Sequence, residues 1–180
     1  MKVVEEMIIN GTAIEEKELI IDEIMNQYGQ EILQLAYSYV NNKAIAEDLT
    51  QDIFVKCYKN LHTYSGKAKL RTSLWRIAIN HCKDFHRSWY QKNVVIAGEE
   101  LPIHGTKKKL VEQTVIQRED DDEIISVIMT LPIKYREVIY LFYYEDLPIK
   151  EIATVTDTGT NTVKTRLRRA KELLKERLEE

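Results

Sequence analysis

Apolar residues recur at intervals of three and four along most of the chain, which is the spacing of one face of an α-helix. The first clear run occupies positions i, i+3, i+4, i+7 and i+8: Ile32, Leu35, Ala36, Tyr39 and Val40. The pair Asn41-Asn42 interrupts it, and a second apolar set follows: Leu49, Ile53, Phe54, Cys57, Tyr58 and Leu61. The pattern predicts two helices, of which the second begins near Ala44.

A third helix is predicted from about Thr72 to Ser88, and it has two distinct faces. The apolar face repeats at helical spacing: Leu74, Ile77, Ala78, His81, Cys82 and Phe85. The polar face carries these residues: Arg76, Asn80, Lys83 and Arg87. Because side chains three and four residues apart share one side of a helix, the first face suits a core and the second suits an anionic partner.

Two stretches fall outside this clear periodicity. Residues 1–25 are acidic and modestly apolar, and they predict an N-terminal extension with a short helix of unknown role. Residues 89–120 contain two glycines, a proline and three consecutive lysines, which predicts a linker. The expected fold class is all-α, with two small helical domains at 26–88 and 121–180 joined by a flexible linker.

The C-terminal segment predicts a helix-turn-helix. A break at Leu131-Pro132 precedes a helix, Pro148 suits the first position of the next one, and residues 157–159 suit a turn. The helix after that turn begins with basic and polar residues and no acid: Asn161, Thr162, Lys164, Thr165, Arg166, Arg168, Arg169 and Lys171. Such side chains bind phosphates and base edges in a major groove, although a solvated face of a structural helix has the same composition.

The loop before the third helix mixes basic and aromatic residues. Lys67, Lys69 and Arg71 lie close in sequence to Tyr64 and Trp75. Cations that follow phosphates and rings that stack on bases are typical of single-strand binding. The first domain is therefore a candidate for unpaired DNA, and the second for duplex DNA.

Composition narrows the choice of function. The chain has 180 residues and a net charge of −3, whereas a protein that binds DNA unaided usually has a basic footprint. Binding is therefore local and assisted, or DNA is not the partner. The absence of a long apolar run predicts no membrane contact and a cytoplasmic protein. Cys57 and Cys82 fit no metal spacing, and no catalytic, metal or cofactor site is expected.

The ordered set of segments resembles the extracytoplasmic-function (ECF) sigma factors of bacterial RNA polymerase. Residues 46–54 are similar to the polymerase-clamp-binding segment of that family, and residues 75–80 to the segment that recognises and opens the −10 element. Residues 131–138 resemble the opening of its second domain, and 150–153 with 162–167 resemble its helix-turn-helix.

Some positions depart from the family pattern. The family usually has Glu at Asp52 and commonly has Trp at Ser73. It usually has Gly at Asp157 and Asn161, and an apolar residue at Thr158, so this turn is unusually polar.

The resemblance implies a factor that binds core RNA polymerase, recognises the −10 and −35 promoter elements and starts promoter-specific transcription, including promoter opening. The implied core-polymerase-binding residues are Asp48, Leu49, Gln51, Asp52 and Phe54. The implied −10 DNA-binding residues are Lys67, Lys69, Arg71, Thr72, Trp75, Arg76, Asn80 and Lys83. The implied −35 DNA-binding residues are Asn161, Thr162, Lys164, Thr165, Arg166, Arg168 and Arg169. The implied partners are core RNA polymerase, promoter DNA and an anti-sigma factor.

Two other functions fit parts of the sequence. A free-standing helix-turn-helix regulator would bind duplex DNA tightly without polymerase. A helical adaptor that does not bind DNA would be insensitive to loss of Arg166 or Arg168.

Overall fold

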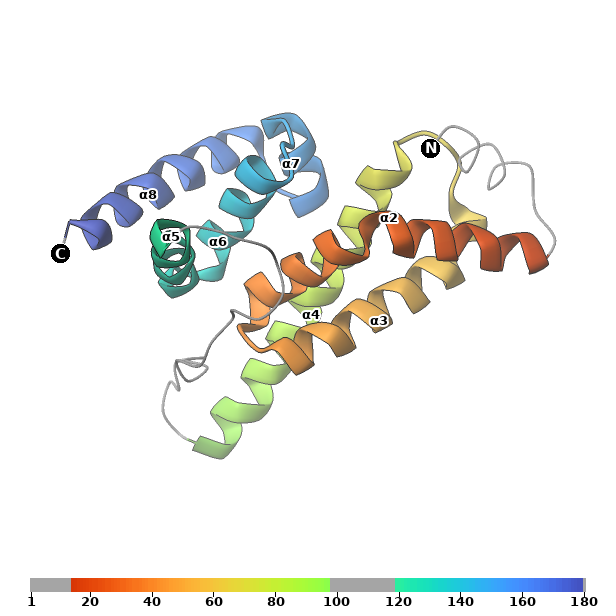
Figure 1. The fold of residues 1–180 in the computed structure, drawn as a ribbon, viewed down its shortest axis with the longest axis horizontal. Coiled ribbons are helices and arrows are strands. Elements are labelled where there is room, and N and C mark those ends of the chain that lie inside the picture. Colours follow the sequence, from red (N-terminus) through yellow and green to blue (C-terminus); the bar gives the residue numbers. More distant parts are fainter. Residues whose placement is uncertain (1–13, 98–118, 180) are drawn as a thin grey trace.

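The computed structural model describes residues 14–97 and 119–179, and the regular structure within those ranges is helical (Figure 1). The elements, in chain order, are α2 (Ile14–Val40), α3 (Lys43–Asn60), the 3₁₀ turn η1 (Leu61–Thr63), α4 (Leu70–Ala97), α5 (Glu119–Thr130), α6 (Ile133–Ile139), the π-helical turn η2 (Tyr140–Tyr144), α7 (Ile149–Thr156) and α8 (Thr160–Leu178). The all-α fold class is confirmed. None of these helices is long and apolar enough to cross a membrane.

Helices α2, α3 and α4 pack together, and the predicted break between the first two is confirmed. Asn41 takes a left-handed backbone conformation (φ 50°) that ends α2, and asparagine tolerates this conformation better than most residues. The Asn42 side chain then accepts a hydrogen bond from the Ile45 amide at 3.1 Å and caps α3.

Helix α2 begins earlier than the sequence pattern indicated. It runs unbroken from Ile14, and Ile20 and Ile24 are each only 2% exposed within the same core as Tyr28 and Ile32. These four residues are spaced by four, so one stripe continues through the acidic segment. Part of residues 1–25 is therefore structural, while residues 1–13 lie outside the described part.

Helix also occupies both ends of the stretch predicted as a linker. Helix α4 continues to Ala97, and α5 begins at Glu119. The rest of the predicted linker, residues 98–118, lies outside the described residues.

The helix-turn-helix prediction is confirmed. Helix α7 ends where Asp157 adopts the left-handed conformation (φ 54°), and Gly159 precedes the first residue of α8. Ile152, Val155 and Val163 are buried between the two helices and the neighbouring domain core. The sequence pattern does not predict the π-helical turn η2, which directly follows α6.

The N-terminal half (residues 14–97) and the C-terminal half (residues 119–179) pack against one another. A single cluster of buried apolar residues includes Leu74, Trp75 and Ile79 from α4 together with Val138, Leu141 and Ile152 from the C-terminal half. Helix α4 packs against α7, and α2 packs against α6. A smaller cluster of Leu131, Ile139 and Ala170 fastens α5 and α6 to α8.

Candidate nucleic-acid and protein interfaces

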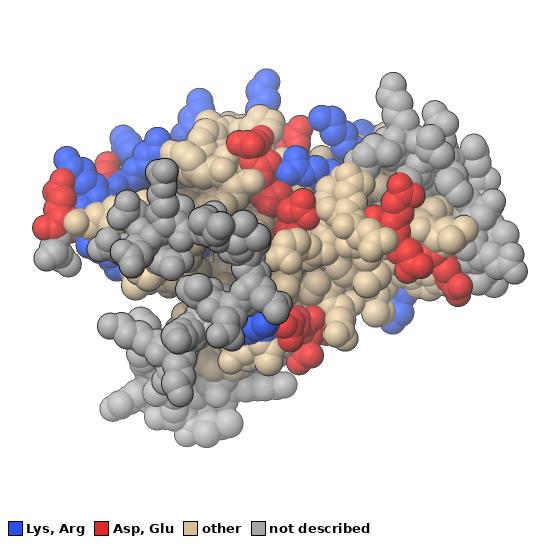
Figure 2. All heavy atoms as spheres, viewed as in Figure 1, with Lys and Arg blue, Asp and Glu red and all other residues tan. Residues whose placement is uncertain are grey.

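Helix α8 presents its basic residues to solvent. Val163, Leu167 and Ala170 face the core, because they lie on the apolar stripe of the helix. The residues predicted to contact the −35 element are exposed, except for the half-buried Arg166: Asn161, Thr162, Lys164, Thr165, Arg168 and Arg169. Figure 2 shows Lys and Arg side chains along the edge formed by this helix. The structure thus brings the predicted set together on one outward surface.

Two of these arginines form exposed ion pairs with acidic residues of the same helix. Arg169 Nη1 lies 3.0 Å from Glu172 Oε2 and 3.6 Å from Glu176 Oε1, and Arg168 Nε lies 3.9 Å from Glu172 Oε1. The hydrogen bond with Glu172 raises the pKa of Arg169. Exposed ion pairs of this kind contribute little to stability, because solvent screens them. A phosphate can therefore replace Glu172 at small cost.

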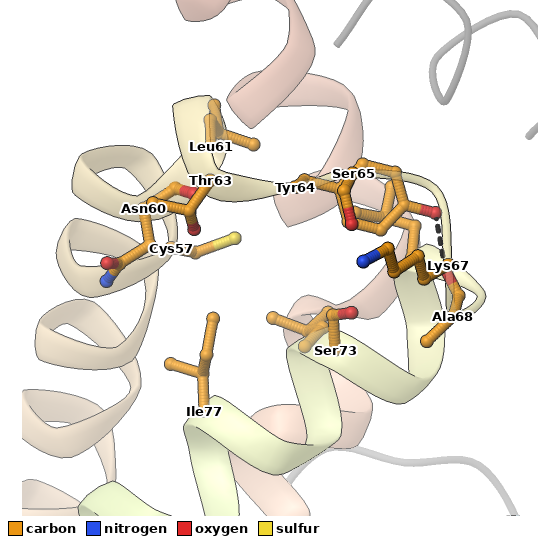
Figure 3. Close-up of a pocket in the computed structure, with 12 residues that line it drawn as sticks. Cys57, Asn60, Leu61, Thr63, Tyr64, Ser65, Lys67, Ala68, Ser73 and Ile77 are labelled. Carbon is orange, nitrogen blue, oxygen red and sulfur yellow. Dashed lines mark hydrogen bonds between the residues drawn. The ribbon is translucent and has the colours of Figure 1, made fainter. Parts of the chain in front are cut away.

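A pocket of about 190 Å³ opens between the end of α3, the following loop and the first turns of α4 (Figure 3). The Tyr64 hydroxyl donates to the Ala68 carbonyl at 2.7 Å, which ties the loop to itself. Figure 3 shows the Lys67 ammonium and the Cys57 thiol pointing into the open space. Burial raises the pKa of Cys57 to about 11, so this wall is neutral at physiological pH. The volume is below the roughly 300–1,000 Å³ of pockets for drug-sized ligands, so the pocket suits only a smaller group.

The sequence identified some of this pocket and missed the rest. Tyr64 and Lys67 stood out as an aromatic residue and a cation in a loop. Ser65, Ser73 and Ile77 also line the pocket. Their small polar and apolar side chains carry no distinctive signal, and only the Ser65-Gly66 turn marked the position of the bend.

The residues predicted to contact −10 DNA separate into two groups. Lys67, Lys69, Arg76 and Asn80 are exposed. The others, Arg71, Thr72, Trp75 and Lys83, are partly or fully buried. The predicted set therefore lies along one loop and helix, but only half of it faces solvent.

The C-terminal half contacts some of these buried residues directly. Arg71 Nη2 donates to the carbonyl and to the Oε2 atom of Glu145, at 2.9 Å each. The Trp75 ring is 0% exposed and meets the Tyr140 ring edge-on, with centroids 6.4 Å apart. In this arrangement the indole has no face available to stack on a base.

Helix α3 carries a solvent-facing stripe that suits a protein partner. Asp48, Gln51 and Asp52 are exposed, and Val55 continues their i, i+3, i+4, i+7 spacing with half of its surface in solvent. Sequence reasoning missed Val55, although its spacing was the available signal. Leu49 and Phe54, also predicted to bind the partner, are only 3% and 4% exposed and fix α3 to the core instead.

His81 joins this stripe to α4. Its Nδ1 atom lies 2.6 Å from the Lys56 ammonium, and its Nε2 atom lies 3.6 Å from Asp52 Oδ2. Burial, followed by the Lys56 charge, lowers the pKa of His81. The imidazole is therefore neutral near pH 7 and can accept a hydrogen bond from Lys56.

Within residues 14–97 and 119–179, no group of three or more His, Cys, Asp or Glu side chains is placed to hold a metal ion. Cys82, next to His81 in sequence, is fully buried, and burial raises its pKa to about 12. The thiol is protonated and unreactive at neutral pH.

Both halves of the chain match known families. Residues 24–91 match the Sigma-70 region 2 family, and residues 121–174 match the Sigma-70, region 4 family. The ECF RNA polymerase sigma factor SigW of Bacillus subtilis (strain 168) is 34% identical over 163 residues, covering 87% of each chain. The RNA polymerase sigma factor SigV of the same strain is 30% identical over 154 residues, covering 84% of this chain and 86% of SigV.

Two solved structures share the fold. The sigma factor RpoE of Bartonella quintana, in complex with the anti-sigma factor NepR, superposes with a TM-score of 0.75 at 19% identity, covering 88% of this chain and 96% of that one. CnrH, in complex with the cytosolic domain of CnrY, superposes with a TM-score of 0.68 at 20% identity, covering 99% and 96%. At these identities the likeness concerns the fold alone.

Proposed function

The chain belongs to the ECF RNA polymerase sigma factors, and on that premise we propose that it binds core RNA polymerase, recognises −10 and −35 promoter elements and opens the promoter. The family is one of transcription initiation factors, and regions 2 and 4 serve promoter recognition and initiation. The observation that carries the proposal is the presence of both regions, in order, with an exposed basic α8 directly after a helix-turn-helix turn.

Core RNA polymerase binds the stripe on α3. Asp48, Gln51 and Asp52 supply charge and hydrogen bonds, and Val55 supplies an apolar contact at the end of the stripe. Leu49 and Phe54 act indirectly, because they are buried and hold the helix in place. The polymerase then supplies much of the affinity for promoter DNA. This fits the net charge of −3, because a protein that binds DNA unaided usually has a basic footprint.

The loop pocket captures one unpaired base of the −10 element. Extruding a base costs a few kcal/mol, and a preformed pocket offsets that cost because the loop is already held by the Tyr64–Ala68 hydrogen bond. Lys67 lies at the pocket, and the exposed Arg76 and Asn80 continue along α4, where they can follow the strand.

The outward surface of α8 enters the −35 major groove. The N-terminal turns of this helix carry exposed amide, hydroxyl and cationic groups, which read base edges and bind phosphates. Ala153 is small and only 8% exposed, so α7 packs closely against α8 and sets the angle at which it projects.

An anti-sigma factor is the further partner we propose. RpoE of Bartonella quintana is recorded in complex with the anti-sigma factor NepR, and it shares this fold. Because the proposed partners are the polymerase and promoter DNA, the proposed place of action is the bacterial cytoplasm.

Run-off transcription with core polymerase, on a library of promoter fragments, tests the proposal. Specific initiation only in the presence of this protein, at fragments that share two upstream elements, is the expected result. Binding of the pure protein to duplex DNA without any initiation would instead favour a free-standing regulator. Initiation with no dependence on sequence would contradict promoter recognition.

A further inference from the structure

Three polar side chains connect the solvent-facing stripe of α3 to helix α4: Lys56, His81 and Asp52. The Lys56 ammonium lies 2.6 Å from His81 Nδ1, and His81 Nε2 lies 3.6 Å from Asp52 Oδ2. The imidazole is 14% exposed, whereas the Asp52 side chain is 68% exposed. A mostly buried ring on α4 therefore joins an exposed lysine to an exposed carboxylate of the stripe.

The Lys56 contact fixes the position of the proton on the neutral ring. An ammonium group donates hydrogen bonds and accepts none, so Nδ1 is the acceptor in this short contact. A neutral imidazole carries one N–H group, which is then on Nε2. Nε2 is buried, and within residues 14–97 and 119–179 it has no partner at hydrogen-bond length. Its contact with Asp52 is therefore one between an N–H group and a carboxylate.

We infer that His81 is a positioning residue for the docking of core polymerase: the neutral ring, with its proton held on Nε2 by Lys56, keeps the Asp52 carboxylate in place on α3, and protonation of the ring weakens docking. The inference rests on the proposed polymerase-binding role of Asp52. An exposed aspartate otherwise samples several rotamers, and ordering such a side chain on binding costs entropy. An N–H group that already attracts the carboxylate reduces this cost.

Protonation of His81 changes both ends of the arrangement. An imidazolium donates from both nitrogens, so Nδ1 no longer accepts from Lys56, and two cations 2.6 Å apart repel each other. The added charge also attracts Asp52, which draws the carboxylate toward α4 and away from a cationic group on the partner. Both changes weaken the stripe as a binding surface, so the association constant for polymerase falls when the ring is protonated.

The groups around His81 set the direction of the pH dependence. The pKa of His81 is lowered, first by burial and then by the Lys56 charge, while Asp52 on α3 and Asp84 on α4 partly oppose this change. The neutral ring therefore persists from high pH to below the usual histidine pKa of about 6.5. Docking is then at full strength near neutral pH and is lost as the pH falls.

Nuclear magnetic resonance of the free protein tests the arrangement without polymerase. Nitrogen-15 spectra should show the His81 ring, assigned by its loss in His81→Gln, with its proton on Nε2 at about pH 7.5. Lys56→Met removes the ammonium and keeps an apolar chain of similar length, so it should move the His81 titration to higher pH. A proton on Nδ1, or a titration that Lys56→Met does not move, would overturn the inference.

Surface plasmon resonance with immobilised core polymerase tests the effect on docking. Between about pH 7.5 and about pH 5.5, the association constant of the parent should fall about three- to tenfold further than that of His81→Gln, because glutamine stays neutral and one proton is linked to docking. His81→Leu lacks the N–H group and should bind more weakly than His81→Gln at both pH values. His62→Gln, the same replacement at an exposed histidine of η1, is the control and should keep the pH dependence of the parent.

Every outcome of the docking measurement bears on the inference. Circular dichroism at each pH checks that the variants are folded, and if His81→Gln does not fold, the Lys56→Met protein should lose docking at a higher pH than the parent. Equal binding by His81→Leu and His81→Gln, or equal pH dependence in the parent, His81→Gln and Lys56→Met, would contradict the role of His81 and leave the proposed function standing. No binding by the parent at either pH would instead contradict polymerase binding itself, and this inference with it.

Discussion

At the scale of single residues, exposure separates side chains that contact a partner from side chains that support them. On α3, Asp52 is exposed while Leu49 and Phe54 are buried, although all three were grouped as polymerase contacts from the sequence. The sequence identifies this segment of α3 through the helical spacing of its polar and apolar residues. It does not identify which side of the helix the rest of the protein covers, and this is why Val55 was missed.

Replacing Asp52 by Lys should weaken association with core polymerase at least tenfold, which corresponds to about 1.4 kcal/mol. The exposed carboxylate becomes a cation at the centre of the proposed contact, while the fold is unaffected because the side chain lies in solvent. Surface plasmon resonance with immobilised core polymerase measures the change.

Asp22→Lys, at an exposed position of α2, is the control for the same change of charge. Equal association constants for the two variants and the parent would exclude α3 as the docking surface.

Asn80 is the residue on which promoter opening can be tested. Its side chain is exposed on α4. Asn80→Ala should lower initiation from duplex promoters roughly two- to tenfold, the range expected for one lost hydrogen bond of about 0.5–1.5 kcal/mol. Initiation from promoters with a pre-melted −10 region should fall less, since opening is already done.

Run-off transcription on both templates measures the difference, with Asn26→Ala on α2 as an exposed control. Equal loss on the two templates would assign Asn80 to a step other than melting.

At the scale of elements, the hydrophobic pattern predicted the helices correctly where one face of a helix is apolar and the other is polar. The break at Asn41-Asn42 and the turn before α8 were both predicted, because asparagine, aspartate and glycine accept the backbone conformations that those positions require. A short helix was predicted within residues 1–25, but its continuity with the next helix was not, because acidic residues surround Ile20 and Ile24. The π-helical turn at 140–144 contains the stacked rings of Tyr140 and Tyr144, and the spacing of apolar residues does not distinguish such a turn from a continuing α-helix.

Helix α8 supports a test of −35 recognition. Arg168 is exposed and tied to Glu172 by only a long ion pair of 3.9 Å. Arg168→Ala should weaken −35-dependent initiation by about 1–3 kcal/mol if the guanidinium reads a base. A promoter that lacks the −35 element should be insensitive to the substitution. Initiation rates on the two promoters, measured at one fixed salt concentration, give the comparison.

Lys175→Ala, in the last turns of the same helix, removes an exposed cation farther from the turn and serves as the control. The same loss from Lys175→Ala would indicate a general charge effect and would contradict recognition by the N-terminal turns.

At the scale of the whole molecule, the closed arrangement was beyond the reach of the sequence. Trp75 was interpreted as a stacking ring because basic residues flank it, and the structure instead buries it against Tyr140, far along the chain. The contact between Tyr39 and Glu137 depends on the complementary shape and charge of two surfaces, one on each folded half of the chain. Periodicity describes each surface separately and contains no information on their pairing.

The shared core makes a prediction about unfolding. Because buried residues of α4 and of α6–α8 form one cluster, the parent protein should unfold in a single cooperative transition. Glu137→Lys breaks the buried pair with Lys83 and should divide this transition into two, since each half keeps packing of its own. Differential scanning calorimetry measures the number of transitions, with Glu179→Lys expected to retain one. Two transitions already present in the parent would mean that the halves are not coupled, and that the covered −10 face is open for much of the time.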